Sequence, residues 1–350
     1  MVGAFFEDST AAGGENNNEA STAGAAYVFT RNNGIWSQQA FLKASNAEED
    51  DLFGASVALE GDTLVVGAYG EASTADGGES NNDAWDVGAV YVFTRSNGSW
   101  SQQAFLKASN TDAYDRFGGS VALDGDTLVV GATGEASTAA GGESNNDASR
   151  AGAVYVFTRS SGVWTQQAFL KASNAEAGDW FGISVALEGD TLVVGARGKD
   201  STAAGGQSNN DAESAGAVYV FTRSNGVWSQ QAFLKASNAE AGDWFGFSVA
   251  LDGDTLAVGA GYEDSTAAGG ESNNDASGAG AVYVFTRSNG IWSQQAFLKA
   301  SNAEESDYFG GTVALEGDTL VVGAFDEAST AAGGESNNDA SEAGAVYVWQ

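Results

Sequence analysis

Carboxylates and amides recur in a long polar stretch of this chain, at a spacing of 64 residues. One repeat of the stretch contains Glu71, Asn81, Asn82 and Asp83. Carboxylate and amide oxygens, together with free backbone carbonyls, are the ligands that Ca²⁺ prefers. The pattern therefore predicts a calcium site in the long stretch, and no other cofactor is expected; the alternative is a solvated loop in which Asn and Asp form local turns. The predicted metal-ligating aspartates are Asp83, Asp147, Asp211, Asp275 and Asp339.

Catalytic chemistry has little support in the residue types present. Histidine and cysteine are both absent, which removes the commonest general base and every thiolate site. The acidic run Glu48–Asp51 could be offered as paired catalytic carboxylates, but four adjacent acids beside a turn are more typical of a solvated cluster. Paired acids also need different environments to separate their pKa values. We therefore expect no enzymatic activity.

Aromatic residues stand at one position of the repeat in some units only. Trp180, Trp244 and Tyr308 directly precede a Phe-Gly pair, where other units have Leu52 and Arg116. Such rings can stack on sugars, or they can simply pack against a neighbouring part of the fold. The units also differ from one another at Tyr69, Trp85, Arg150 and Arg197, and variable loop positions are where a binding function would be added.

The elements that must position these residues are β-strands. In the unit that begins at residue 53, strands are predicted over 55–59, 62–68, 89–94 and 100–107, with Glu60-Gly61 and Asn97-Gly98 as tight turns between them. Lys107 and its equivalents end the fourth strand, where a lysine either protects an exposed sheet edge or is simply solvated. Four antiparallel strands in a repeated unit match a β-propeller blade, so the predicted fold is an all-β propeller over residues 1–350 as a single domain.

Three motifs recur in fixed register: Phe-Gly precedes the first strand, Val-Gly-Ala ends the second, and Gly-Ala-Val-Tyr-Val-Phe forms the third. Together they resemble the FG-GAP repeat of integrin α-chain propellers and of bacterial surface and secreted proteins. The resemblance implies a propeller of four-stranded antiparallel blades. Many members carry a calcium loop, Asp-x-Asp-x-Asp-Gly, between the first two strands; here that connection is only Glu60-Gly61. The usual calcium sites of the family are therefore not expected. The Phe-Gly pairs lie at 53–54, 117–118, 181–182, 245–246 and 309–310.

The number of blades has two interpretations. First and fourth strands each occur five times, whereas second and third strands occur six times. Five full blades plus a surplus hairpin are slightly favoured, and six blades, two of them three-stranded, are the alternative. Residues 1–46 and 309–350 are then partial blades, and 1–46 is expected to help close the ring. We expect their open edges to pair within one chain or between two, so self-association is also expected.

Composition sets the expected partners and location. The chain has 14 basic and 47 acidic residues, a net charge of −33, which disfavours nucleic acid and anionic lipid as ligands. No apolar run is long enough for membrane insertion. The expected function is a non-enzymatic binding, adhesion or assembly module, extracellular or at the cell surface, with a protein or glycan ligand. The alternatives are a lectin-like propeller and a repeat-amplified or engineered scaffold without an evolved ligand. No signal peptide is visible in this chain.

Overall fold

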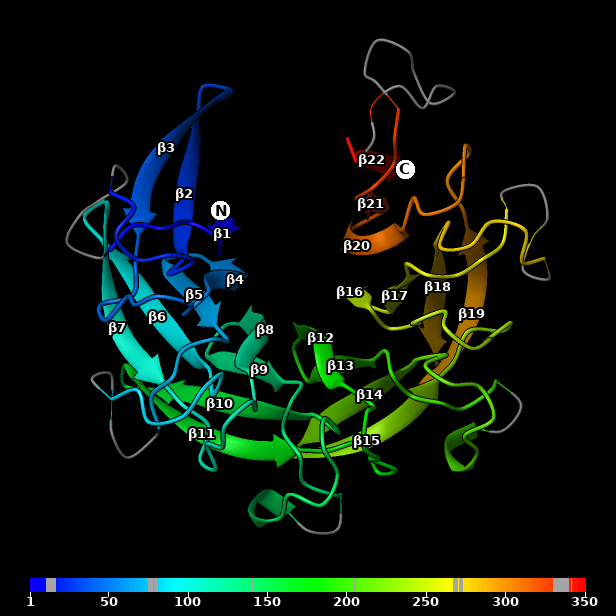
Figure 1. The fold of residues 1–350 in the computed structure, drawn as a ribbon, viewed down its shortest axis with the longest axis horizontal. Helices are drawn as coiled ribbons and strands as arrows, with labels where there is room; N and C mark the ends of the chain where they lie inside the picture. Colours follow the sequence, from blue (N-terminus) through cyan, green and yellow to red (C-terminus); the bar gives the residue numbers. More distant parts are fainter. Residues whose placement is uncertain are drawn as a thin grey trace. The chain divides into compact units, whose positions relative to one another are not determined.

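The fold consists of antiparallel β-sheets joined by long loops (Figure 1). The structure is a computed structural model that describes residues 1–10, 17–74, 78, 81–139, 142–203, 206–266, 270, 273–329, 340 and 342–350. The chain divides into two compact units, Met1–Lys171 and Ala172–Gln350, which are described separately below. Apart from strands, the described residues form 3-10 turns at Gly142–Ser144 and Gly206–Ser208.

The first unit holds three consecutive sheets, which we name blades 1, 2 and 3. Blade 1 has three strands, and blades 2 and 3 have four each. Blade 1 consists of β1 (Val2–Ala4), β2 (Ala25–Asn32) and β3 (Ile35–Leu42); blade 2 of β4 (Phe53–Glu60), β5 (Thr63–Ala68), β6 (Ala89–Ser96) and β7 (Ser99–Leu106); blade 3 of β8 (Phe117–Asp124), β9 (Thr127–Ala132), β10 (Ala153–Ser160) and β11 (Val163–Leu170).

The second unit holds blades 4, 5 and 6, of which blades 4 and 5 are four-stranded and blade 6 is three-stranded. Blade 4 consists of β12 (Phe181–Glu188), β13 (Thr191–Ala196), β14 (Ala217–Ser224) and β15 (Val227–Leu234); blade 5 of β16 (Ser248–Asp252), β17 (Thr255–Ala260), β18 (Ala281–Ser288) and β19 (Ile291–Leu298); blade 6 of β20 (Phe309–Glu316), β21 (Thr319–Ala324) and β22 (Ala345–Trp349).

The predicted propeller of repeated four-stranded blades is confirmed, with six blades in total. The strands that form are the expected ones. Because β3 pairs with β2 in the sheet of β1 and β2, and not with the C-terminal strands, the structure has the six blades of the alternative interpretation. Residues 1–46 and 309–350 contain the two three-stranded blades. One sheet ends at β3 and another at β22.

The Phe-Gly and Gly-Ala motifs hold neighbouring blades together. Phe117 is fully buried and packs edge-to-face on Tyr155, with 5.4 Å between ring centroids. Gly118 has a φ of +91°, a backbone conformation that favours glycine. Its carbonyl oxygen would lie only 2.0 Å from a Cβ added at Gly67 of the preceding blade, so both motifs need glycine to let two backbones meet.

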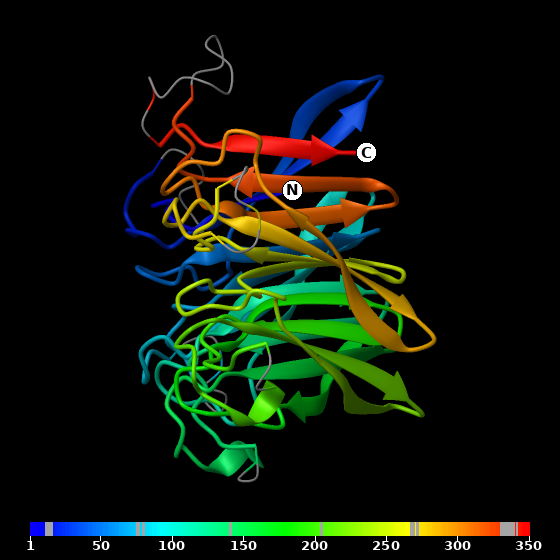
Figure 2. The ribbon, with the colours of Figure 1, turned by 90° about the vertical axis from the view of Figure 1, so that its right-hand side faces the viewer.

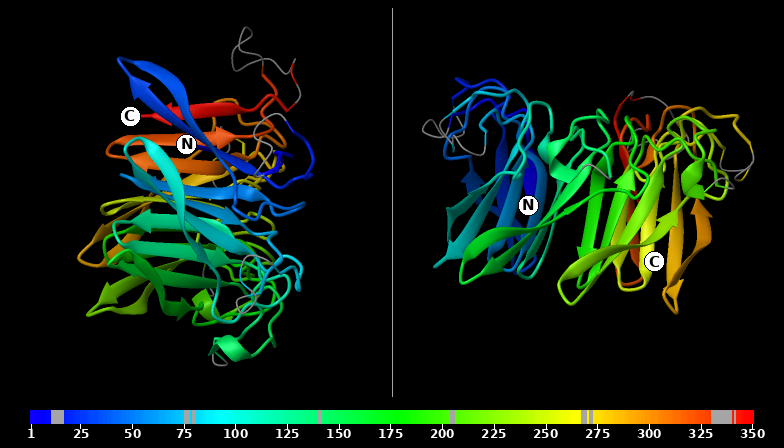
Figure 3. Two further views of the ribbon diagram at one scale, coloured as in Figure 1. Left: turned by 90° about the vertical axis from the view of Figure 1, so that its left-hand side faces the viewer. Right: turned by 90° about the horizontal axis from the view of Figure 1, so that it is seen from below.

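Each blade has its long loop and its tight turns at opposite ends of the strands. The Asn97-Gly98 turn has positive φ at both residues, 52° and 81°, as expected for a two-residue hairpin. The loops that follow β13 and β17 lie together at one end of the strands in Figure 2, and those that follow β5 and β9 do so in the left panel of Figure 3. The connection that leads into the next blade starts from the same end.

Candidate functional site

The predicted metal ligands lie on the surface of the long loops. Asp83, Asp147, Asp211 and Asp275 are all exposed. Two of them accept hydrogen bonds from side-chain amides: Asn209 donates to Asp211 at 2.8 Å and Asn273 to Asp275 at 3.3 Å. Asp339 lies outside the described residues.

Carboxylates do not converge on a common point in these loops as far as the structure describes them. Across the described residues, no group of three or more acidic side chains is arranged to hold a metal ion. The loop cores are instead organised by amides: the Asn81 Oδ1 accepts from the Thr74 amide at 2.9 Å, and the Asn81 Nδ2 donates to the Thr74 hydroxyl at 3.2 Å. Calcium binding by the five aspartates therefore stays a prediction.

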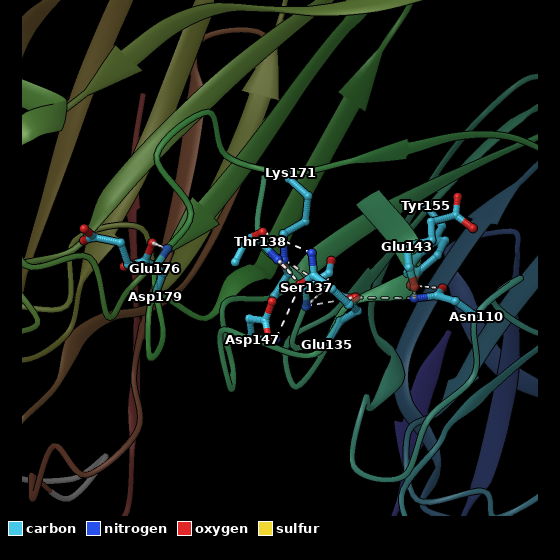
Figure 4. Close-up of polar contacts among 12 residues, drawn as sticks. Asn110, Glu135, Ser137, Thr138, Glu143, Asp147, Tyr155, Lys171, Glu176 and Asp179 are labelled. Atoms are coloured by element: carbon cyan, nitrogen blue, oxygen red, sulfur yellow. Dashed lines mark hydrogen bonds and ion pairs between the residues drawn. The ribbon is translucent and has the colours of Figure 1, made fainter. Parts of the chain in front are cut away.

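In four of the six blades, a buried ion pair lies beneath the long loop. In blade 3, the Lys171 Nζ lies 2.9 Å from the Glu135 Oε2, and the two side chains are only 5% and 1% exposed (Figure 4). Ser137 donates to the same carboxylate from its hydroxyl at 2.9 Å and from its amide at 3.1 Å. Asn110 donates to it as well, at 3.3 Å, and accepts from the Tyr155 hydroxyl at 2.6 Å. The equivalent pairs are Glu7–Lys43, Glu71–Lys107 and Glu263–Lys299, at 2.9–3.0 Å.

Strand order explains why this pair forms. In blade 2, β5 and β7 both pair with β6 in the antiparallel sense, so their C-terminal ends lie at the same end of the sheet. Glu71 follows β5 by three residues and Lys107 follows β7 directly. The side chains therefore meet where the long loop begins. The lysines were predicted to protect an edge or to be solvated, and for Lys43, Lys107, Lys171 and Lys299 both interpretations are wrong because the ammonium is buried on a carboxylate.

A second buried carboxyl lies next to the ion pairs of Glu71, Glu135 and Glu263. Asp51 is 4% exposed, and its Oδ2 accepts a hydrogen bond from the Glu48 amide at 2.8 Å. Burial raises the pKa of Asp51 to about 7; the Glu48 amide hydrogen bond opposes this shift and the nearby Glu71 charge adds to it. The run Glu48–Asp51 is thus not one solvated cluster, because its last member turns inward. Burial likewise raises the pKa of Asp115 to about 7 and that of Asp243 to about 8.

The second unit carries a continuous row of aromatic rings with one guanidinium inserted. The Arg197 Cζ lies 4.7 Å from the Trp180 ring centroid and 4.3 Å from that of Trp244. Trp244 contacts Tyr262 at 4.0 Å, and Tyr262 contacts Tyr308 at 4.7 Å. We define the aromatic row as Trp180, Arg197, Trp244, Tyr262, Tyr308 and Phe325, whose last two rings stack at 4.8 Å.

Strand pairing brings the row together. Phe181 pairs with Ala196, so Trp180 and Arg197 lie side by side at the end of β12 and β13. Contacts then alternate between residues of one blade and residues of the next. Trp180 and Trp244 have positive φ, 57° and 56°, but so does Leu52 at the same position of the repeat, at 59°. The backbone conformation thus belongs to the repeat and does not demand an aromatic side chain.

Most of the aromatic row is half-buried, and Phe325 is 49% exposed. Burial lowers the pKa of Arg197, whose guanidinium has no carboxylate partner among the described residues. The expected packing against a neighbouring blade is confirmed, since Arg197 of blade 4 covers Trp244 of blade 5. An accessible aromatic surface remains, and its unpaired cation lies in a strongly acidic protein.

Comparison with known protein families decides the classification. The model of the FG-GAP repeat matches residues 36–93, 100–157, 164–221, 228–285 and 292–349, which is well over half of the chain. The chain belongs to the FG-GAP repeat family. Each FG-GAP match begins in the last strand of one blade and ends in the third strand of the next blade. No curated protein matched the sequence. The described part of this FG-GAP chain has no helix long and apolar enough to cross a membrane.

Two features of this FG-GAP protein were missed by sequence reasoning. The sequence does contain a signal for the Glu–Lys pairs, because Glu71 and Lys107 both recur every 64 residues. Their contact, however, depends on the order of the strands in the sheet. The role of Arg197 had only a weak signal, as a residue that differs between repeats. The rings expected before Phe-Gly are part of the aromatic row, whereas Tyr262 was not singled out.

Proposed function

We propose that this FG-GAP propeller is a non-enzymatic binding and adhesion module that works outside the cell or at its surface, and that the aromatic row is its ligand-binding face. The observation that carries the proposal is the row itself. Half-exposed Trp, Tyr and Arg side chains are the residue types that dominate binding energy at interfaces. FG-GAP repeats are typical of extracellular and surface proteins, which supports the proposed location.

A non-enzymatic role is supported by the state of the acidic groups. The chain has no histidine. The carboxylates with unusual surroundings, Glu71 and Asp51, are 1% and 4% exposed, and Glu71 is paired with Lys107. A general acid or base must reach its substrate, and these groups lie beneath the loops.

A glycan is the ligand class that the aromatic row favours. The proposed lectin-like function would therefore use the aromatic row as its binding site. Flat rings offer stacking surfaces for the apolar faces of sugars, and the Arg197 guanidinium offers hydrogen-bond donors beside them. Each ring contributes a weak contact, and several rings in a row add their contributions. A protein ligand, as in adhesion or assembly, is the second candidate, because Trp and Arg are equally typical of protein interfaces.

A glycan array with the full chain, followed by titration calorimetry of the best glycan, tests the proposal. Trp244→Ala should reduce affinity by at least tenfold, because Trp244 contacts both Arg197 and Tyr262. Trp85→Ala is the matched control, since Trp85 is 71% exposed and lies outside the row. Equal losses in both variants would refute the aromatic row as the binding face. Binding to proteins of the cell surface but to no glycan would favour the second candidate.

A further inference from the structure

Blade 4 departs from the other blades at the buried ion pair. Glu7, Glu71, Glu135, Glu263 and Glu327 occupy one position of the repeat, whereas blade 4 has Lys199 there. Lys199 is fully buried, and its Nζ points to the carboxylates of Glu176 and Asp179, at 2.5 and 3.4 Å. Blade 4 has therefore gained a cation at the place where four other blades bury a carboxylate on a lysine.

The hydrogen-bond donors that surround that carboxylate are retained in blade 4. In blade 5, the Glu263 Oε2 accepts from the Ser265 hydroxyl at 2.8 Å, the Ser265 amide at 3.1 Å and the Lys299 Nζ at 2.9 Å. The equivalent donors in blade 4 are Ser201 and Lys235. The acceptor that would serve all of them is missing.

Ser201 is left with an unsatisfied hydroxyl. It is fully buried, and its Oγ has no hydrogen-bond partner in the described structure. A buried polar atom without a partner is costly and rare in native proteins. The serines at this position in blades 1, 2, 3, 5 and 6 all donate to a glutamate.

Lys235 is left without a carboxylate. It keeps the hydrogen bond to the Gly216 carbonyl that its equivalents make to Gly24, Gly88 and Gly152, but it forms no ion pair with any described residue. Burial lowers the pKa of Lys235 to about 7; the Lys199 charge contributes to this shift, while the charges of Asp243 and Asp200 oppose it. Two lysines thus share a site that has one lysine and one glutamate elsewhere.

We propose that blade 4 binds a small carboxylate, of the size of formate, which replaces the missing glutamate carboxylate and accepts hydrogen bonds from Ser201 and Lys235. A water molecule could satisfy Ser201 but would not neutralise Lys235. Because Ser201 is fully buried, the proposal is confined to a carboxylate of the size of formate. The site is distinct from the aromatic row, so the inference does not rest on the proposed function.

Thermal unfolding of the full chain in sodium formate, with sodium gluconate holding the ionic strength constant, tests the proposal. Wild type should show a saturable rise in melting temperature with formate, because a ligand that binds only the folded state stabilises it. Lys199→Glu restores the arrangement of the other blades and should abolish the response. Glu263→Lys creates the arrangement of blade 4 in blade 5 and should increase it. Equal responses in wild type and Lys199→Glu would overturn the proposal.

Acylation of lysines near pH 7, followed by mass spectrometry, gives a local readout that does not depend on either variant. Formate should slow the labelling of Lys235 at least threefold and leave that of Lys107 unchanged, since Lys107 already has Glu71. Unchanged labelling of Lys235 at saturating formate would overturn the proposal. So would protection of Lys235 by sodium chloride with none by formate, because the site would then bind a halide rather than a carboxylate.

Discussion

At the scale of residues, the charged groups of this protein differ in how deeply they are buried. Lys107 and Glu71 form their ion pair with side chains that are 6% and 1% exposed, and the carboxylate receives further hydrogen bonds from Ser73. Surface pairs such as Arg95–Asp62, whose aspartate is 66% exposed, are screened by solvent. Breaking a buried pair leaves an uncompensated charge, whereas breaking a surface pair does not.

We expect Lys107→Met to lower the free energy of unfolding by about 3–5 kcal/mol, because Glu71 would stay buried without its cation. Asp62→Asn, which removes a surface pair, should lower it by less than about 1 kcal/mol. Urea denaturation followed by circular dichroism measures both. Similar losses in the two variants would contradict the structural role given to the buried pair.

Asp51 predicts a pH dependence of stability. Its folded-state pKa of about 7 lies above the ordinary value of 3.8, so the folded state holds this proton more tightly than the unfolded chain does. The stabilisation is complete below about pH 4 and is lost as the pH rises to about 7. The free energy of unfolding of wild type relative to Asp51→Asn should therefore fall across this window. A difference between wild type and Asp51→Asn that does not change with pH would contradict this assignment.

At the scale of elements, the long loops carry the calcium prediction. Their aspartates are exposed where the structure describes them. Glu71, which belongs to the same polar stretch as Asp83, is buried and forms an ion pair with Lys107. Calcium would therefore have to be bound by the outer part of the loop alone, through its aspartates, amides and backbone carbonyls.

If the loops bind calcium, the melting temperature should rise between chelator and millimolar calcium at matched ionic strength, and replacing the predicted aspartates by asparagine should remove the rise. An unchanged melting temperature in wild type would contradict calcium binding and would favour the interpretation of the loops as solvated turns. The aspartates to be replaced are Asp83, Asp147, Asp211, Asp275 and Asp339.

At the scale of the whole molecule, the two three-stranded blades leave strand edges open. Blade 1 begins at β1, because it lacks the strand equivalent to β4 of blade 2, and blade 6 ends at β22, whose Val346 and Val348 are 69% and 57% exposed. An open edge with apolar side chains favours pairing with another strand. The strand inventory of the sequence predicts that the terminal blades fill each other's edges, within one chain or between two.

If the terminal blades pair, removal of residues 1–43 should weaken hydrogen-exchange protection at Val346–Val348, because that pairing would cover the open edge of β22. Light scattering of the intact protein distinguishes pairing within a monomer from pairing in a dimer. Equal protection with and without residues 1–43 would exclude pairing of the ends.

The repeat made most of the fold predictable from the sequence. Alternating strands, the Asn-Gly turns and the Phe-Gly and Gly-Ala motifs depend on local conformation and on close approaches that glycine alone permits, and these recur in register. Strand limits agree to within about two residues, as for β6 at Ala89–Ser96 against the expected 89–94. The number of blades was not decided, because identical strands can pair in more than one way.

Only the tertiary structure decided which charges are buried. Glu71 and Lys107 meet because β5 and β7 flank β6, an arrangement that local sequence does not specify. Asp51 turns inward although three acids precede it, since its carboxyl accepts the Glu48 amide. Trp180, Arg197 and Trp244 are far apart in sequence and join only where two blades pack. Periodicity determines the strands of this protein, whereas the contacts between strand ends determine its candidate sites.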